Sequence, residues 1–304
     1  MLKAGNSHAL GVAGVIAASC LWGTTGVSAS LAPEVGPLAI GAAAMGGGGL
    51  LLAMIALPLI ARSASALRAR LPFLILAGLS VALYPLAFYG SMRLAGITVG
   101  TVVSIGSAPA LAALIEWLAD GKRPTARFAF AALMGALGIA VLALARSGGA
   151  AGSEPALGLL AALLAGLTYA FYSWAAGRLM QQGIPGKAAM GSLFGIGAAF
   201  LFPVLLATGA PFLDSFRNLS VGLYMATVPM FLGYLCFGFG LARIAASEAT
   251  AISLLEPVAA AGLAALIAGE RLPGLAWCGI GLIFASLAFL VCGTRKRRMQ
   301  AKTS

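Results

Sequence analysis

Long apolar runs alternate along the chain with short segments that hold charged, glycine or proline residues. A helix needs about 20 mainly apolar residues to cross about 30 Å of hydrocarbon. Ten runs meet that length: 9–31, 37–61, 71–93, 98–119, 125–145, 155–180, 187–208, 219–243, 248–268 and 273–292. The pattern therefore predicts an all-α membrane protein with ten transmembrane helices.

Composition supports this prediction. Of the 304 residues, 61% are hydrophobic and 9% are charged, whereas a soluble domain carries about 25% charged residues. We expect the first run to remain in place as a span, because it is longer than the apolar part of a secretory signal peptide.

The positive charge is distributed unevenly between the loops. Fifteen of the 19 Lys and Arg residues fall on the side of the N-terminus, and only Arg93, Arg146, Arg217 and Arg271 fall on the other side. Loops rich in Lys and Arg stay in the cytoplasm. We therefore expect a multi-pass protein of the cytoplasmic (inner) membrane with both termini in the cytoplasm. The basic tail 295–298 indicates contact with anionic headgroups rather than with nucleic acid.

The sequence repeats at an offset of 148 residues. Pro37 then aligns with Pro185, Pro109 with Pro257, Gly121 with Gly269 and Arg123 with Arg271. Residues 1–150 form one repeat of five runs, and residues 151–304 form the second together with the basic tail. Because five is odd, the second repeat enters the membrane in the opposite orientation. Two inverted five-helix repeats around a central cavity are typical of transporters.

Several kinds of chemistry lack the residues they need. His8, on the N-terminal tail and expected to be solvated, is the one histidine, so Ser–His catalysis and His-based metal sites are excluded. The four cysteines form no C-x-x-C motif and are expected to pack in the core. No phosphate-binding glycine motif occurs. We expect no enzymatic activity, no cofactor and no metal.

Glu256 is unusual because a carboxylate near the middle of a span costs about 3 kcal/mol unless it faces a cavity or a partner. Pro257 beside it removes the backbone hydrogen bond to Ser253 and bends the helix. Two interpretations stay open: Glu256 binds a substrate ammonium group or switches its protonation state, or it forms a hydrogen bond between helices. Kinks that open a cavity or a gate are expected at Pro85, Pro109, Pro229 and Pro257.

Polar aromatic residues near the middle of several spans indicate a chamber. A Tyr hydroxyl or Trp N–H at that depth needs a partner. We predict a substrate cavity lined by Trp22, Thr24, Tyr84, Ser104, Ser107, Tyr169, Tyr234, Ser253 and Glu256. Residues nearer the span ends are expected at the membrane interface: Tyr89, Trp117, Trp174 and Trp277, with Glu116 also able to reach it.

The pairs Trp22-Gly23 and Glu256-Pro257, with Pro109 and Gly269-Glu270, resemble the drug/metabolite transporter superfamily in its two-repeat EamA-type members. Within that group the chain looks most like the YddG-type amino-acid exporters. The resemblance implies export of amino acids by alternating access. The first half departs from the pattern at Asp120-Gly121-Lys122, where the second half has Ala268-Gly269-Glu270.

Substrate charge is limited by the position of the cations, which all fall in loops, tails or span ends. Anionic solutes are therefore disfavoured, and a small neutral, zwitterionic or cationic solute is expected. One alternative is efflux of drugs or quaternary cations, in which Glu256 and the aromatic rings bind the cation. Another is a membrane scaffold or sensor that transports nothing. Proton coupling, and the choice between monomer and homodimer, stay open.

Overall fold

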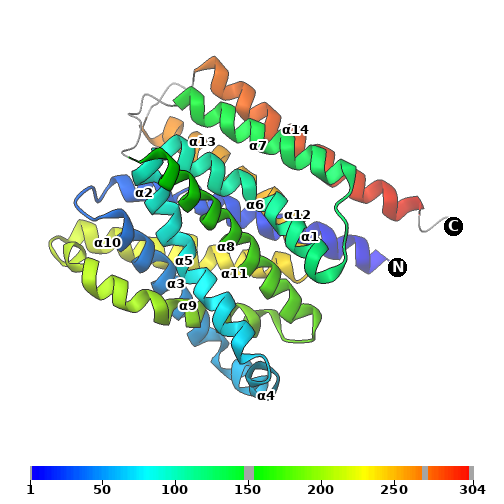
Figure 1. The fold of residues 1–304 in the computed structure, drawn as a ribbon, viewed down its shortest axis with the longest axis horizontal. Coiled ribbons are helices and arrows are strands. Elements are labelled where there is room, and N and C mark those ends of the chain that lie inside the picture. Colours follow the sequence, from blue (N-terminus) through cyan, green and yellow to red (C-terminus); the bar gives the residue numbers. More distant parts are fainter. Residues whose placement is uncertain (1, 147–153, 269–272, 301–304) are drawn as a thin grey trace.

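The computed structural model describes residues 2–146, 154–268 and 273–300, and these form helices without any strand (Figure 1). The long helices are α1 (Leu2–Trp22), α3 (Pro37–Arg62), α5 (Leu71–Ala95), α6 (Ile97–Asp120), α7 (Ala126–Arg146), α8 (Pro155–Gln181), α9 (Gly186–Thr208) and α14 (Gly274–Gln300). The shorter elements are α2 (Thr25–Ser30), α4 (Ala64–Arg68), η1 (Ala210–Leu213), α10 (Phe216–Met225), η2 (Ala226–Leu232), α11 (Gly233–Leu241), α12 (Ala246–Ile252), η3 (Ser253–Leu255) and α13 (Glu256–Ala268).

Eight helical segments among the described residues are long and apolar enough to cross a membrane, and they correspond to the first eight apolar runs. The run 248–268 is divided among α12, η3 and α13. In the last run, the apolar helix Gly274–Leu290 is shorter than the other segments. The total of ten spans therefore stays a prediction.

Proline and glycine set several helix ends. Pro37 and Pro155 are the first residues of α3 and α8, where a missing N–H leaves no helical hydrogen bond unmade. Gly121 follows α6 with φ +69°, a conformation that other residues adopt with strain. The N–H groups of Gly121 and Lys122 then bond to the carbonyls of Trp117 and Glu116, which satisfies the end of the helix.

The four prolines expected to kink helices lie in different kinds of element in the structure. Pro85 and Pro109 lie inside the continuous helices α5 and α6. Pro229 lies in η2, a π-helical segment between α10 and α11. For Pro257, the expected kink inside a continuous helix is not what the structure has. Helix α12 is followed by a 3₁₀ turn, Ser253–Leu255, and α13 starts anew at Glu256. Pro257 is thus in a first turn, where proline is well tolerated.

The helices pack in pairs that the 148-residue offset exchanges. Helix α3 packs on α9 and α7 packs on α14, and both pairs are equivalent helices of the two repeats. Helix α5 packs on α8, and the offset carries that pair onto α11 and α1, which also pack together.

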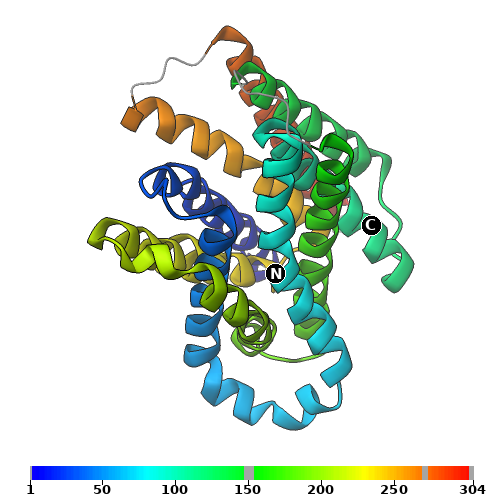
Figure 2. The same ribbon diagram turned by 60° about the vertical axis from the view of Figure 1, so that its left-hand side comes forward.

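The contact between α7 and α14 shows the same exchange at single residues. A Cβ on Gly138 would lie 2.9 Å from the Gly279 carbonyl oxygen, and a Cβ on Gly279 would lie 2.7 Å from the Gly138 carbonyl oxygen. The offset carries this pair onto Ser286 and Ala131, and the Ser286 hydroxyl donates to the Ala131 carbonyl at 2.7 Å. Figures 1 and 2 both show α7 and α14 side by side at the edge of the bundle.

The bundle has two distinct ends. The first turns of α1 and the last turns of α14 lie at the right of Figure 1, and the short helix α4 lies at its bottom; we call this side the termini end. Helices α2 and α10 lie at the opposite, or far, end (Figure 1).

Candidate functional site

A pocket of about 500 Å³, its open mouth included, lies between the two halves of the chain. Its lining comes from the end of α1, the start of α2, the first half of α3, the second half of α5, the middle of α8, η2, α11 and the start of α13. The lining residues are Trp22, Thr25, Gly41, Ala44, Met45, Tyr84, Pro85, Phe88, Tyr89, Tyr169, Met230, Tyr234 and Glu256. Since α1 starts at the termini end and α3 at the far end, the pocket lies in the half of the bundle towards the far end.

Aromatic rings make up much of the wall. The Trp22 ring lies 4.9 Å from that of Tyr234, and the Tyr84 ring lies 5.5 Å from that of Tyr169 and 5.7 Å from that of Phe88, measured between centroids. These distances are typical of stacked and edge-to-face ring pairs. The wall therefore presents ring faces and edges to a ligand and is rigidly supported by neighbouring rings.

Trp22 brings an unused hydrogen-bond donor to this wall. Its side chain is 4% exposed, and its indole Nε1 is buried without any hydrogen-bond partner. Gly233 makes room for the indole, because a Cβ there would lie 2.6 Å from Nε1. A buried donor without a partner is costly and uncommon in native proteins.

Glu256 supplies the one acidic group of the lining, and no basic side chain lies in the lining. It is the first residue of α13 and is half-buried. Its carboxylate makes no hydrogen bond to any described residue, so its acceptor oxygens are available to a ligand. The carboxylate attracts an ammonium group as an opposite charge, and the aromatic faces around it attract the same group through cation–π contacts.

Buried aromatic and hydroxyl groups close the pocket towards the termini end. The Tyr169 hydroxyl donates to Ser253 Oγ at 2.8 Å, and the hydroxyls of Tyr172 and Tyr234 are 2.7 Å apart. Phe194 and Phe237 are fully buried against the same tyrosines. We call Tyr172, Phe194 and Phe237 the aromatic floor.

The structure brings together five of the nine predicted cavity residues, Trp22, Tyr84, Tyr169, Tyr234 and Glu256, and also Pro85. Ser253 lies just outside the lining and bonds to Tyr169. Thr24 lies in the turn after α1 and donates to the Leu21 carbonyl at 2.7 Å. A substrate contact by any of these residues stays a prediction.

Ser104 and Ser107 occupy a different place from the one predicted. Both hydroxyls are buried without a hydrogen-bond partner, and neither residue lines the pocket. A Cβ on Gly166 of α8 would lie 2.3 Å from Ser107 Oγ and 2.8 Å from the Ser104 carbonyl. These serines therefore lie where α6 packs on α8, close to the buried Pro109.

The sequence missed several lining residues. Tyr89 was expected at the membrane interface, but it lines the pocket with Phe88. Positions 84, 85, 88 and 89 share one face of a helix. The predicted roles of Tyr84 and Pro85 therefore indicated that Phe88 and Tyr89 face the same cavity. Thr25, Met45 and Met230 carry no such signal, because apolar and hydroxyl residues occur throughout the spans.

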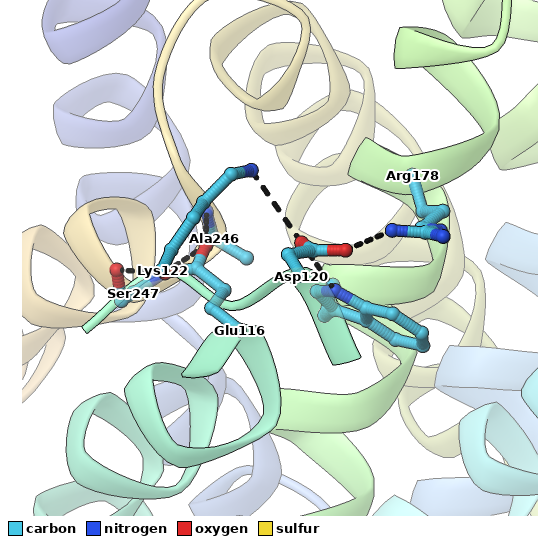
Figure 3. A network of polar contacts seen from close by, with 7 residues as sticks. Glu116, Asp120, Lys122, Arg178, Ala246 and Ser247 are labelled. Carbon is cyan, nitrogen blue, oxygen red and sulfur yellow. Dashed lines mark hydrogen bonds and ion pairs between the residues drawn. The ribbon is translucent and has the colours of Figure 1, made fainter. Parts of the chain in front are cut away.

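Glu116 also differs from its expected place at the interface. It is 7% exposed, and its carboxylate accepts hydrogen bonds from the N–H groups of Ala246 and Ser247, at 2.9 and 3.3 Å, and from the Ser247 hydroxyl at 2.5 Å (Figure 3). Those N–H groups begin α12, so Glu116 on α6 caps a helix of the other repeat.

One turn further along, Asp120 forms a second set of contacts. Its carboxylate accepts from the Trp174 indole at 3.0 Å and from the Arg178 guanidinium, and Lys122 lies 3.4 Å away (Figure 3). Trp174, expected at the membrane interface, thus donates a hydrogen bond to Asp120. Glu116, Asp120, Lys122, Trp174, Arg178, Ala246 and Ser247 form the termini-side network.

His8 was expected to be a solvated tail residue, and that expectation is wrong. It lies in α1, and its Nε2 is 2.9 Å from Glu248 Oε1, with both side chains mostly buried. This contact again joins the two repeats on the termini side of the pocket.

The cysteines do not all pack in the core. Cys20 and Cys278 are exposed, Cys236 is half-buried, and the side chain of Cys292 lies outside the described part of the structure. Within the described residues, no group of three His, Cys, Asp or Glu side chains is arranged to hold a metal ion.

The chain matches the model of the EamA-like transporter family twice, over residues 9–144 and 156–292. This chain belongs to that family of the drug/metabolite transporter superfamily. The two matches fall one in each half of the chain, and the pocket lining takes residues from both. The chain is thus a multi-pass membrane protein of a transporter family, with a small-molecule substrate and membrane lipid as its expected partners.

Two named relatives and one solved structure are similar to this transporter. The "Uncharacterized transporter YwfM" of Bacillus subtilis (strain 168) is 33% identical over 287 residues, which cover 93% of this chain and 94% of that protein. The "Probable amino-acid metabolite efflux pump" of Salmonella typhimurium (strain LT2) is 33% identical over 144 residues, covering 42% and 48%. A crystal structure with 22% identity superimposes with a TM-score of 0.79 over 96% of this chain and 98% of that one, which shows a shared fold.

Proposed function

We propose that this protein exports amino acids, aromatic and other neutral ones, across the cytoplasmic membrane by alternating access. The observation that carries the proposal is the pocket, where one carboxylate without a hydrogen-bond partner faces aromatic rings and no cation. Glu256 would bind the substrate ammonium group, and the rings would pack on the substrate side chain.

Two inverted five-helix repeats, residues 1–150 and 151–304, provide the framework of the proposed mechanism. The packing pairs that the 148-residue offset exchanges support it, because two near-equivalent halves can exchange conformations and so open the site to either side. With the N-terminus in the cytoplasm, the far end faces outwards, and the pocket is then seen in its outward-facing state.

Direction and substrate class draw additional support from a relative whose name states amino-acid metabolite efflux and which matches 42% of this chain. The absence of basic side chains from the described lining argues against sugar phosphates and other anions, which need cations at the binding depth.

Counterflow in proteoliposomes tests the proposal. Vesicles preloaded with unlabelled phenylalanine should accumulate labelled phenylalanine, and Trp22→Ala or Tyr84→Ala should reduce the rate at least roughly fivefold, since each removes a ring from the wall. Trp277→Ala is the matched control, because Trp277 is 62% exposed and is not a lining residue. Unchanged flux in both pocket variants would remove the assignment of the pocket.

Efflux of amphipathic or quaternary cations is the second candidate, and the aromatic wall with its single carboxylate favours it specifically. The two candidates separate in a competition assay. A quaternary ammonium that displaces phenylalanine and is itself accumulated supports cation efflux, whereas a cation that neither competes nor moves supports amino-acid export.

A scaffold or sensor without transport activity would give no flux for any solute in the panel. Repeating the assay with and without a pH gradient separates proton antiport from passive exchange. Cross-linking in the same vesicles distinguishes a monomer from a homodimer.

A further inference from the structure

We propose that Glu116 and the start of α12 form the gate on the termini side of the pocket, and that this contact holds the protein in the conformation described here. The inference rests on the proposed alternating access and adds to it a gate residue and a preferred resting state.

Glu116 lies on α6 and caps α12, so the contact joins the first repeat to the second. Helix α12 runs from this contact towards the pocket, because Ser253, directly after α12, bonds to the lining residue Tyr169. For the pocket to open towards the termini end, α6 and α12 must move apart, and the three hydrogen bonds to the Glu116 carboxylate must break.

The contact is strong because of its surroundings. Glu116 and Ser247 are 7% and 8% exposed, and hydrogen bonds to a charged group gain strength where water is excluded. By contrast, the ion pair between Glu34 and Arg217 at the far end is 3.3 Å long, and its side chains are 57% and 61% exposed. Surface pairs of that kind contribute little.

The sequence makes the gate one-sided. At the 148-residue offset, Glu116 corresponds to Ala264 and Ser247 to Val99. The partners Asp120, Trp174 and Arg178 correspond to Ala268, Gly26 and Ser30. If the two repeats exchange conformations, the far end closes without any equivalent carboxylate cap. The closed termini side is therefore favoured over the closed far side.

Thiol labelling can follow both sides of the pocket in one protein. Ser173 on α8 is fully buried, and its hydroxyl has no hydrogen-bond partner, so Ser173→Cys costs no hydrogen bond. It lies in the same turn of α8 as Tyr172 and Trp174, on the termini side of the lining residue Tyr169, and we choose it as the reporter of opening towards the termini end. Thr25→Cys in the pocket lining reports the far side. Each reporter is introduced after the four native cysteines are replaced by alanine.

The measurement is the rate of labelling by a small maleimide in lipid nanodiscs, with and without Glu116→Gln or Ser247→Ala. We expect faster labelling at Ser173→Cys and slower labelling at Thr25→Cys, each by roughly tenfold for Glu116→Gln, given the strength of a charged hydrogen bond. Ser247→Ala, which removes one bond, should give a smaller shift in the same directions. Glu34→Gln is the control and should change neither rate.

Two results would overturn the gate: unchanged rates at both reporters, or faster labelling at Ser173→Cys alone, which would mean local loosening. If Glu116→Gln fails to give a monodisperse protein, the milder Ser247→Ala decides by the same pair of rates. No substrate is needed. Reciprocal labelling without any amino-acid flux would therefore keep the gate and reject the proposed substrate, while flux with unchanged labelling would do the reverse.

Discussion

Glu116 and Glu256 both lie among apolar helices, but Glu116 is buried and Glu256 is half-buried at a pocket. Three donors converge on Glu116, two from the backbone at the start of α12 and one from Ser247. Glu256 has no hydrogen bond to any described residue and faces a pocket of aromatic rings. A buried carboxylate that is fully satisfied stabilises one arrangement of the helices, whereas an unsatisfied one is available to a ligand.

The largest expected effect is on stability and should separate the two carboxylates. Glu116→Ala leaves the Ala246 and Ser247 donors buried without an acceptor, which costs about 3 kcal/mol of unfolding free energy. Glu256→Ala removes no hydrogen bond and should cost less than ~1 kcal/mol. Thermal unfolding of both variants in the same detergent measures the difference, and equal losses would contradict the contrast.

The reverse order is expected for ligand binding. Glu256→Gln removes the negative charge of the pocket at constant volume, so binding of a quaternary cation should weaken by at least roughly tenfold. Binding of a zwitterionic amino acid should weaken only a few-fold, because the amide oxygen still accepts from the ammonium. Ligand titration of wild type, Glu256→Gln and Glu34→Gln checks this. Loss of binding in the Glu34 variant would point to a site elsewhere.

A smaller effect on transport is expected from a substitution that displaces the Trp22 indole. Gly233→Ala places a methyl group 2.6 Å from Trp22 Nε1, so the indole must shift and phenylalanine flux should fall roughly fivefold. Gly262→Ala on α13 is the matched control, because a Cβ there meets nothing within 4 Å. Equal flux in the two variants would show that the position of the indole is unimportant.

The smallest effect is expected at the exposed pair of the far end. Glu34→Gln removes the negative charge from its contact with Arg217, and should change the unfolding free energy by less than ~0.5 kcal/mol, since both groups are largely hydrated. The same denaturation series checks this value. A loss comparable with that of Glu116→Ala would mean that exposure does not explain the difference between the two ends.

The sequence determined the helical class and the family, because both depend on the length and spacing of apolar runs and on residues that recur at a fixed offset. The offset of 148 residues and the position of Glu256 could be read without any coordinates. The sequence also predicted the pocket aromatics Trp22, Tyr84, Tyr169 and Tyr234, because the polar group of a ring at that depth needs a hydrogen-bond partner.

Only the tertiary structure decided which polar residues face which partner. Ser104 and Ser107 look like cavity residues in the sequence, but Gly166 brings α8 close against them. His8, 240 positions from Glu248 along the chain, pairs with it because α1 passes that part of the other repeat.

Glu116 shows the physical reason most clearly. Its distance from the span end suggested that it reaches the interface, whereas a helix start 130 residues later supplies its donors. Apolar periodicity reports the depth of a residue and the helix that carries it. The direction of a side chain around the helix, and the helix it meets, depend on close packing between segments far apart in sequence.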